Sequence, residues 1–258
     1  FRAGDSYAPI VEVDPSNLDA TFTDVYKSGE AVSIDAFGRG KDLKLVMLTK
    51  DKKIYEYDLG TDKSIANASR SINYTEITIA RTDATITYDK SGNIWLNQHL
   101  VTATAEEPTI AHISIADGID YNNVLAGLSH NGTENCGIAV SPDGKLLAVV
   151  GAGTKKITIY EIENTAGNIS LSSKYTISTA GTRHTALAWD YAGNLYAGNR
   201  GSEDIRHYAI PYSGTVSTPC ASKYAFELKE VYALTKIDLN AYKEAVNNKY
   251  RFFSFGDC

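Results

Sequence analysis

A unit of about fifty residues recurs along this chain, and it constrains the fold more than any other feature of the sequence. In its clearest copies an alternating apolar run, a polar turn with glycine and a second apolar run follow one another, at residues 84–96, 137–149 and 185–197. The turn glycines Gly92, Gly144 and Gly193 are 52 and 49 residues apart. A fixed period of this length indicates a repeat architecture, and several short strands per repeat predict a β-propeller.

The alternation extends on both sides of these units. Each repeat ends in a further alternating strand, and a fourth, degenerate copy precedes the others at residues 32–48. Candidate first strands of the four repeats lie at about 20–26, 74–79, 123–128 and 173–178. Residues 223–228 and 250–255 read as strands of a fifth unit, with a short helix or polar loop at 239–249 and a contribution from 9–13. We therefore predict an all-β, single-domain propeller over residues 1–258 with five four-stranded blades, the alternative being part of a six- or seven-bladed one.

Composition excludes some classes of function and favours one compartment. A net charge of -6 and a pI near 5.4 argue against a nucleic-acid partner. No apolar run approaches the roughly 20 residues that a membrane-spanning helix needs. Seventeen tyrosines, abundant polar residues and four N-x-S/T sequons favour an extracellular or cell-surface protein. Because Phe1 is no initiator, we expect any leader or anchor to lie outside this sequence.

The cysteines give no metal motif. Cys136, Cys220 and Cys258 are odd in number and far apart, without zinc-ligand spacing. We expect buried free thiols, and a disulfide pair remains an alternative for an exported chain.

The segment 137–146, Gly-Ile-Ala-Val-Ser-Pro-Asp-Gly-Lys-Leu, resembles the blade signature of NHL, YVTN-type and SMP-30/gluconolactonase-like propellers. The turns at 89–95 and 190–196 are similar to it. The resemblance covers roughly residues 31–211 and implies the fold, but such propellers include hydrolases, binding modules and scaffolds. The acids Asp89, Asp143 and Asp190 in these turns are interpreted as hairpin residues, since Asp, Asn and Gly stabilise tight turns.

One positional pattern is able to carry chemistry. A polar residue precedes the same apolar run in every repeat, at spacings of 53, 52 and 49: Glu30, Asp83, Asn135 and His184. Equivalent positions of a propeller lie on one ring around its axis, so these side chains are predicted to converge at one mouth of the channel. Arg81 and Arg183 lie close by in sequence and are able to contact an acidic ligand.

Three interpretations of this ring stay open. Its members are polar either because strands enter there from a solvated loop, or because they bind a small ligand or glycan, or because they hold a divalent cation. The resemblance to SMP-30-like enzymes, which take metal ligands from several blades, implies a divalent cation here. No catalytic motif occurs elsewhere, so we predict a non-catalytic, exported propeller that binds a glycan or protein at one channel mouth and has no cofactor. The alternatives are a metal-dependent lactonase or related hydrolase, and a structural module of a larger surface protein or complex.

Overall fold

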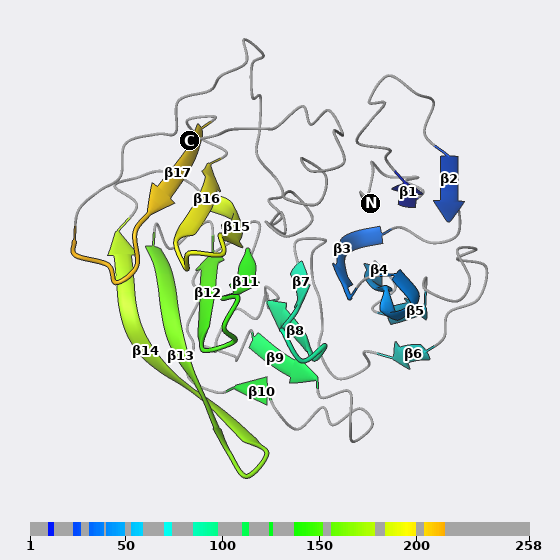
Figure 1. Ribbon diagram of the computed structural model, residues 1–258, viewed down its shortest axis with the longest axis horizontal. Coiled ribbons are helices and arrows are strands. Elements are labelled where there is room, and N and C mark those ends of the chain that lie inside the picture. The colour runs from blue at the N-terminus through cyan, green and yellow to red at the C-terminus, as the bar shows by residue number, and fades with distance from the viewer. Residues whose placement is uncertain are drawn as a thin grey trace, which may run out of the picture.

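The computed structural model shows a chain of antiparallel β-strands (Figure 1). It describes residues 10–12, 23–26, 31–38, 40–49, 53–58, 70–73, 85–97, 110–113, 124–125, 137–151, 156–178, 184–199 and 204–214. Within these ranges the helical content is one three-residue 3-10 turn, Gly40–Asp42, and no helix is long enough to cross a membrane. The all-β prediction is confirmed.

The described strands form five sheets, and in each sheet consecutive strands pair with one another. The first is a ribbon of β1 (Ile10–Glu12) and β2 (Thr23–Tyr26). The second holds β3 (Ala31–Phe37), β4 (Lys44–Thr49), β5 (Lys53–Asp58) and β6 (Arg70–Asn73). The third holds β7 (Thr85–Tyr88), β8 (Ile94–Asn97), β9 (Ile110–Ile113) and β10 (Val124–Leu125). The fourth holds β11 (Ile138–Val140), β12 (Leu146–Gly151), β13 (Lys156–Thr165) and β14 (Asn168–Ser178). The fifth holds β15 (His184–Trp189), β16 (Leu195–Asn199) and β17 (Asp204–Tyr208).

The second to fifth sheets are successive blades of a propeller. Their first strands contact one another in chain order, β3 with β7, β7 with β11 and β11 with β15. Figure 1 shows these four strands on the side of each sheet that faces the middle of the molecule. Each blade therefore presents its first strand to the centre and its last strand to the outside.

The expected assignment of outer strands to blades was wrong by one blade. Residues 173–178 belong to β14, which pairs with β13 of the blade before it, and β10 likewise pairs with β9. A two-residue turn joins β13 to β14, so local hairpin pairing determines the blade to which β14 belongs. At the N-terminus β1 pairs with β2. The segments predicted for a fifth blade, 223–228, 239–249 and 250–255, lie outside the described residues.

The core consists of apolar clusters between adjacent blades. The side chains predicted to pack there are all buried: Ile86, Trp95, Ile138, Val140, Leu187 and Trp189. Trp189 lies in the cluster between the fourth and fifth sheets, and its indole N–H donates to the carbonyl oxygen of Ala139 at 3.0 Å. The blades are thus joined by polar contacts as well as by apolar burial.

Candidate functional site

The predicted polar ring lies where the inner strands begin. Glu30 immediately precedes β3, Asp83 and Asn135 shortly precede β7 and β11, and His184 is the first residue of β15. These four strands, the first of their sheets, are neighbours around the centre. The backbone of His184 pairs with Asn199, but its side chain and the other three residues lie outside what the structure describes. Convergence of the ring therefore stays a prediction.

Other residues singled out in the sequence fall outside the described ranges as well. They are Arg81, Arg183 and the three cysteines Cys136, Cys220 and Cys258. Among the residues that are described, no group of three His, Cys, Asp or Glu side chains is arranged to hold a metal ion.

The turn acids are hairpin residues, as predicted. Asp190 accepts hydrogen bonds from the backbone N–H of Asn194 at 2.8 Å and from its side-chain amide at 3.0 Å. Asp143 accepts from the Ser141 hydroxyl at 2.6 Å and from the backbone N–H of Lys145 at 3.1 Å. Burial raises the pKa of Asp143, but the Ser141 hydroxyl and the backbone N–H of Lys145 outweigh burial and lower this pKa. These carboxylates stabilise their own turns.

Asp89 makes the same turn contacts and also reaches two further strands. Its Oδ1 accepts from the backbone N–H groups of Ser91 and Asn93, at 2.8 and 3.0 Å. Its Oδ2 accepts from the Asn93 amide at 3.0 Å and from the indole N–H of Trp95 on β8 at 3.3 Å. The Nε2 atom of His112 on β9 lies 3.9 Å from the same oxygen, and its ring packs edge-on against Trp95. Asp89 thus joins three strands of one blade.

The surroundings of Asp89 keep it ionised. Burial raises the pKa of this carboxyl, but the His112 imidazole and the N–H groups of Asn93 and Ser91 outweigh burial and bring the pKa to about 2. Both oxygens already accept two hydrogen bonds each, and the Trp95 and His112 rings are 1% and 5% exposed. This arrangement suits an anchor within the blade better than an acid or base that meets a substrate.

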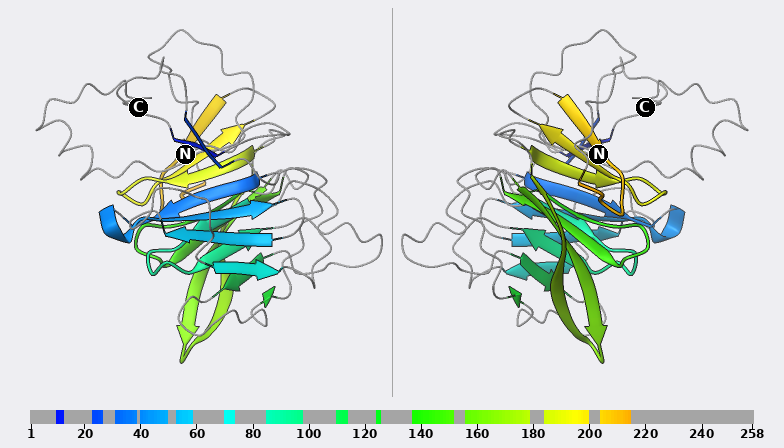
Figure 2. Two further views of the ribbon diagram at one scale, coloured as in Figure 1. Left: turned by 90° about the vertical axis from the view of Figure 1, so that its right-hand side faces the viewer. Right: turned by 90° about the vertical axis from the view of Figure 1, so that its left-hand side faces the viewer.

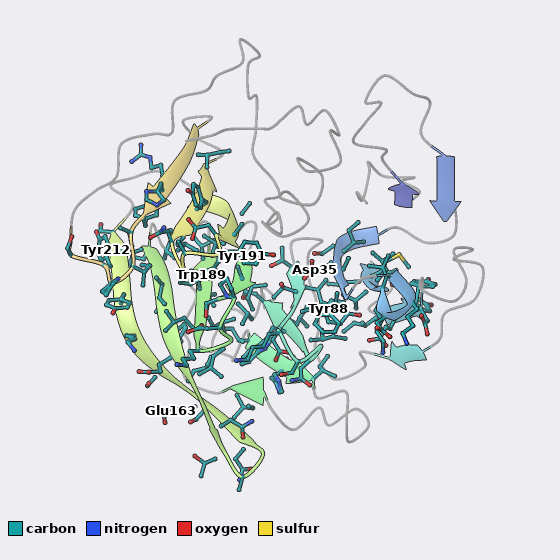
Figure 3. The ribbon with its side chains drawn as sticks, viewed as in Figure 1. Asp35, Tyr88, Glu163, Trp189, Tyr191 and Tyr212 are labelled. Carbon is teal, nitrogen blue, oxygen red and sulfur yellow. The ribbon has the colours of Figure 1, made fainter. Side chains whose placement is uncertain are left out.

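Asp35, on the inner strand β3, was not among the predicted residues. Its Oδ2 accepts from the Thr87 hydroxyl at 2.9 Å and from the backbone N–H of Tyr88 at 2.7 Å, and Ser33 accepts from Ile86 N–H at 3.1 Å. Figure 3 shows Asp35 and Tyr88 on the facing strands β3 and β7. The available signal was an acid within a strand of mainly apolar residues. Its contacts clamp the first two described blades together.

The β7–β8 and β11–β12 turns pack against neighbouring blades. The Lys90 ammonium donates to the carbonyl oxygen of Asp143 in the next blade. A Cβ on Gly144 would lie 2.8 Å from the Lys90 side chain, and one on Gly92 would lie 3.1 Å from the Phe37 ring. The turns at this end of the inner strands therefore form a continuous surface across three blades.

The feature that departs most from the repeat is the hairpin of β13 and β14. Its strands are 10 and 11 residues long, whereas the outer strands β6 and β10 have 4 and 2. β12 pairs with β13 only as far as Glu161, and among the described strands none joins β13 and β14 beyond that point. Figure 2 shows this end of the hairpin extending past the other strands. We call residues 162–173 the projecting hairpin.

The tip of the projecting hairpin has the geometry of a tight two-residue turn. Ala166 and Gly167 have φ values of +53° and +89°, and Gly167 N–H donates to the Asn164 side-chain oxygen at 3.0 Å. Positive φ at both central residues is typical of a type I′ turn, whose twist matches that of paired strands. The hairpin is thus an ordered ribbon.

A bulge sets the orientation of the projecting hairpin. Ile159 pairs with Tyr175 and Tyr160 with Ser173, which leaves Lys174 without a counterpart on β13. One extra residue moves the later side chains to the opposite face. The apolar residues of β14 before and after Lys174 accordingly pack on different blade interfaces.

The two faces of the projecting hairpin differ in chemistry. Ile162, Ile169 and Leu171 are partly buried against the cluster between the third and fourth sheets. The opposite face is polar and exposed, with Glu163 accepting from the Ser172 hydroxyl at 3.1 Å. A turn signal, Asn-Thr-Ala-Gly-Asn at 164–168 between alternating runs, was present in the sequence. The length of the β13–β14 hairpin and the bulge at Lys174 were not predicted.

Known structures share this architecture. The β-propeller domain of Cps50 (Swd1) from Myceliophteria thermophila superposes with a TM-score of 0.54 at 11% identity, over 89% of this chain and 84% of that chain. A chain of the mitotic checkpoint complex gives a TM-score of 0.51 at 15% identity, over 76% of this chain and 53% of that one, so the match spans about half of its length. No protein-family model and no curated protein matches the sequence.

The chain is a β-propeller. The first of the two similar structures is a β-propeller domain, so the comparisons support the fold class. The narrower resemblance to NHL, YVTN-type or SMP-30-like propellers and the number of blades stay predictions.

Proposed function

We propose that this protein is a non-catalytic propeller that binds a partner protein through the surface that carries the projecting hairpin. The observation behind the proposal is the hairpin itself, because residues 162–173 extend beyond the blade and expose a polar face. The described parts of the outer strands of the second and third sheets are only four and two residues long, so the extension is particular to the fourth sheet. Surfaces that a rigid scaffold presents in this way are typical positions for binding.

Two further observations support a binding role. One of the similar structures is a chain of a complex, the mitotic checkpoint complex, and propellers use one fold for many binding functions. The described turn acids Asp89, Asp143 and Asp190 are engaged within their own turns. Export to the cell surface and recognition of a glycan are further parts of the proposal that rest on composition alone.

The test compares the protein with a variant in which residues 162–173 are replaced by a short turn. Both are used to capture proteins from extracts of the source cells, and Asp83→Ala serves as the matched control in the predicted polar ring. The proposal requires a partner that binds the intact chain and Asp83→Ala but not the shortened variant. Capture that survives shortening and fails with Asp83→Ala would instead place binding at the polar ring.

A metal-dependent hydrolase is the second candidate. The observation that favours it is the recurrence of a polar residue, Glu30, Asp83, Asn135 and His184, at the same place of the sequence repeat, at or shortly before the starts of four neighbouring inner strands. Oxygen and nitrogen donors of these kinds suit a divalent cation. Elemental analysis of the purified protein tests this candidate, which needs one bound cation per chain and its loss in Asp83→Ala.

A further inference from the structure

We infer that the outer edge of β14 in the projecting hairpin binds an extended, basic segment of a partner protein as an added β-strand. This inference rests on the proposed function and specifies the chemistry of the partner. β14 is the last strand of its sheet, and no described strand pairs with its outer edge. An edge strand offers unpaired N–H and C=O groups that an extended peptide is able to complete.

Over residues 168–173 the edge of β14 lacks the features that usually prevent such pairing. Natural edge strands are protected by charges, prolines, bulges or short length. β14 carries a bulge and a charge at Lys174, whose ammonium bonds Glu161 at 2.9 Å. Beyond that point, residues 168–173 read Asn-Ile-Ser-Leu-Ser-Ser, without charge, proline or glycine. Protection therefore ends where the projecting hairpin begins.

The polar face selects a basic segment. Glu163 on β13 is exposed and pairs in register with Ser170 on β14. A strand added to β14 would lie about 10 Å from β13, twice the spacing of paired strands. Ser170 and Ser172 are short, so a lysine or arginine of the added strand is able to reach across them to the Glu163 carboxylate.

The opposite face selects apolar residues at alternate positions. Ile169 and Leu171 are partly exposed beside the cluster that they cover. Side chains of an added strand alternate between the two faces. The expected ligand therefore alternates basic and apolar residues.

The test measures binding of a fluorescein-labelled peptide of about eight residues that alternates lysine and valine, a usual strand length. Fluorescence anisotropy should show binding to the intact chain. An analogue with glutamate in place of lysine, and one with N-methylated backbone amides, should not bind. Binding of either analogue as tightly as the lysine peptide would overturn the inference.

Protein variants locate the site. Glu163→Gln should weaken binding of the lysine peptide about two- to fivefold, the effect of one exposed ion pair. Ser170→Lys places a like charge at the edge and should also weaken it, by up to about fivefold. Ser178→Lys adds the same charge to β14 outside the projecting hairpin and should leave binding unchanged. Circular dichroism confirms that each variant is folded, and equal loss in both lysine variants would overturn the assigned edge.

Two outcomes separate this inference from the proposed function. If the peptide does not bind although partner capture depends on the projecting hairpin, strand addition is wrong and protein binding by the hairpin stands. If the intact chain forms dimers that Ser170→Lys dissolves, measured by light scattering, the occupant of the edge is a second copy and the basic partner segment is overturned.

Discussion

Replacing Asp89 by alanine should destabilise the propeller more than the same change at Asp190. Both carboxylates accept two bonds from the asparagine four residues later, so both variants lose these turn contacts. Asp89 also accepts a hydrogen bond from the indole N–H of Trp95, a residue that is only 1% exposed. Asp190→Ala is therefore a matched control for the turn, and the difference between the two variants isolates the contacts that cross to β8 and β9.

The size of this difference in stability follows from the burial of the Trp95 indole N–H, which loses its acceptor in Asp89→Ala. A buried N–H left without an acceptor costs about 1–3 kcal/mol. The Ser91 N–H is exposed and can bond water, so its loss adds little, whereas the His112 ring 3.9 Å from the carboxylate contributes to the part of the difference that depends on the charge of Asp89. We expect Asp89→Ala to lower the free energy of unfolding by about 1–3 kcal/mol more than Asp190→Ala, measured by urea unfolding followed by circular dichroism.

The pH dependence gives an independent check. The pKa of Asp89 is about 2 in the folded chain and 3.8 as its ordinary value, so the folded state favours the ionised carboxyl. Its contribution to stability is complete well above pH 3.8 and is lost as the pH falls through about 2. The stability advantage of the natural chain over Asp89→Ala should shrink by about 1–2 kcal/mol over this interval, after allowance for partial exposure.

Equal destabilisation by Asp89→Ala and Asp190→Ala would refute the reasoning. It would show that the Trp95 contact adds nothing to the turn. A difference that persists unchanged at low pH would show that the charge of Asp89 is not what stabilises the blade.

Three further changes test the packing. Gly92→Ala should lower the melting midpoint more than Gly193→Ala. Both residues have positive φ, +80° and +85°, but only the new Cβ at position 92 would press on a neighbour, the Phe37 ring. Equal shifts would show that backbone strain alone matters. Ala166→Asn should slow hydrogen exchange in the projecting hairpin, since Asn tolerates the φ of +53° better than Ala does, and unchanged protection would contradict the turn assignment. Leu187→Ala should reduce the free energy of unfolding by about 2–5 kcal/mol, because this residue is buried between blades; an unchanged urea midpoint would show that its side chain contributes nothing there.

The blade pattern could be predicted because its causes are local. Alternation with period two places Ile86, Ile138 and Leu187 on buried faces, and their burial is confirmed. The Asp and Gly residues of the tight turns form hydrogen bonds within a few residues of themselves. Each of these features is encoded in a short window, so the repeat, the hairpins and the all-β class follow from the sequence by itself.

Convergence of the polar ring does not follow from the local sequence. The sequence places Glu30, Asp83, Asn135 and His184 at equivalent positions of the repeat, and the described inner strands begin within three residues of them. Whether the side chains converge depends on loop conformations that no short window specifies. Their chemistry therefore remains a prediction.

Only the tertiary structure decided which distant groups meet. Asp89 lies close to His112 because β9 pairs with β8, and Asp35 accepts a hydrogen bond from the Tyr88 N–H because two blades pack together. The bulge at Lys174 moves the apolar residues of β14 from one blade interface to another, although the alternation along the strand is unbroken. Sequence determines which residues share a face of a strand, whereas pairing register and blade packing determine what that face meets, because these depend on contacts between segments far apart in the chain.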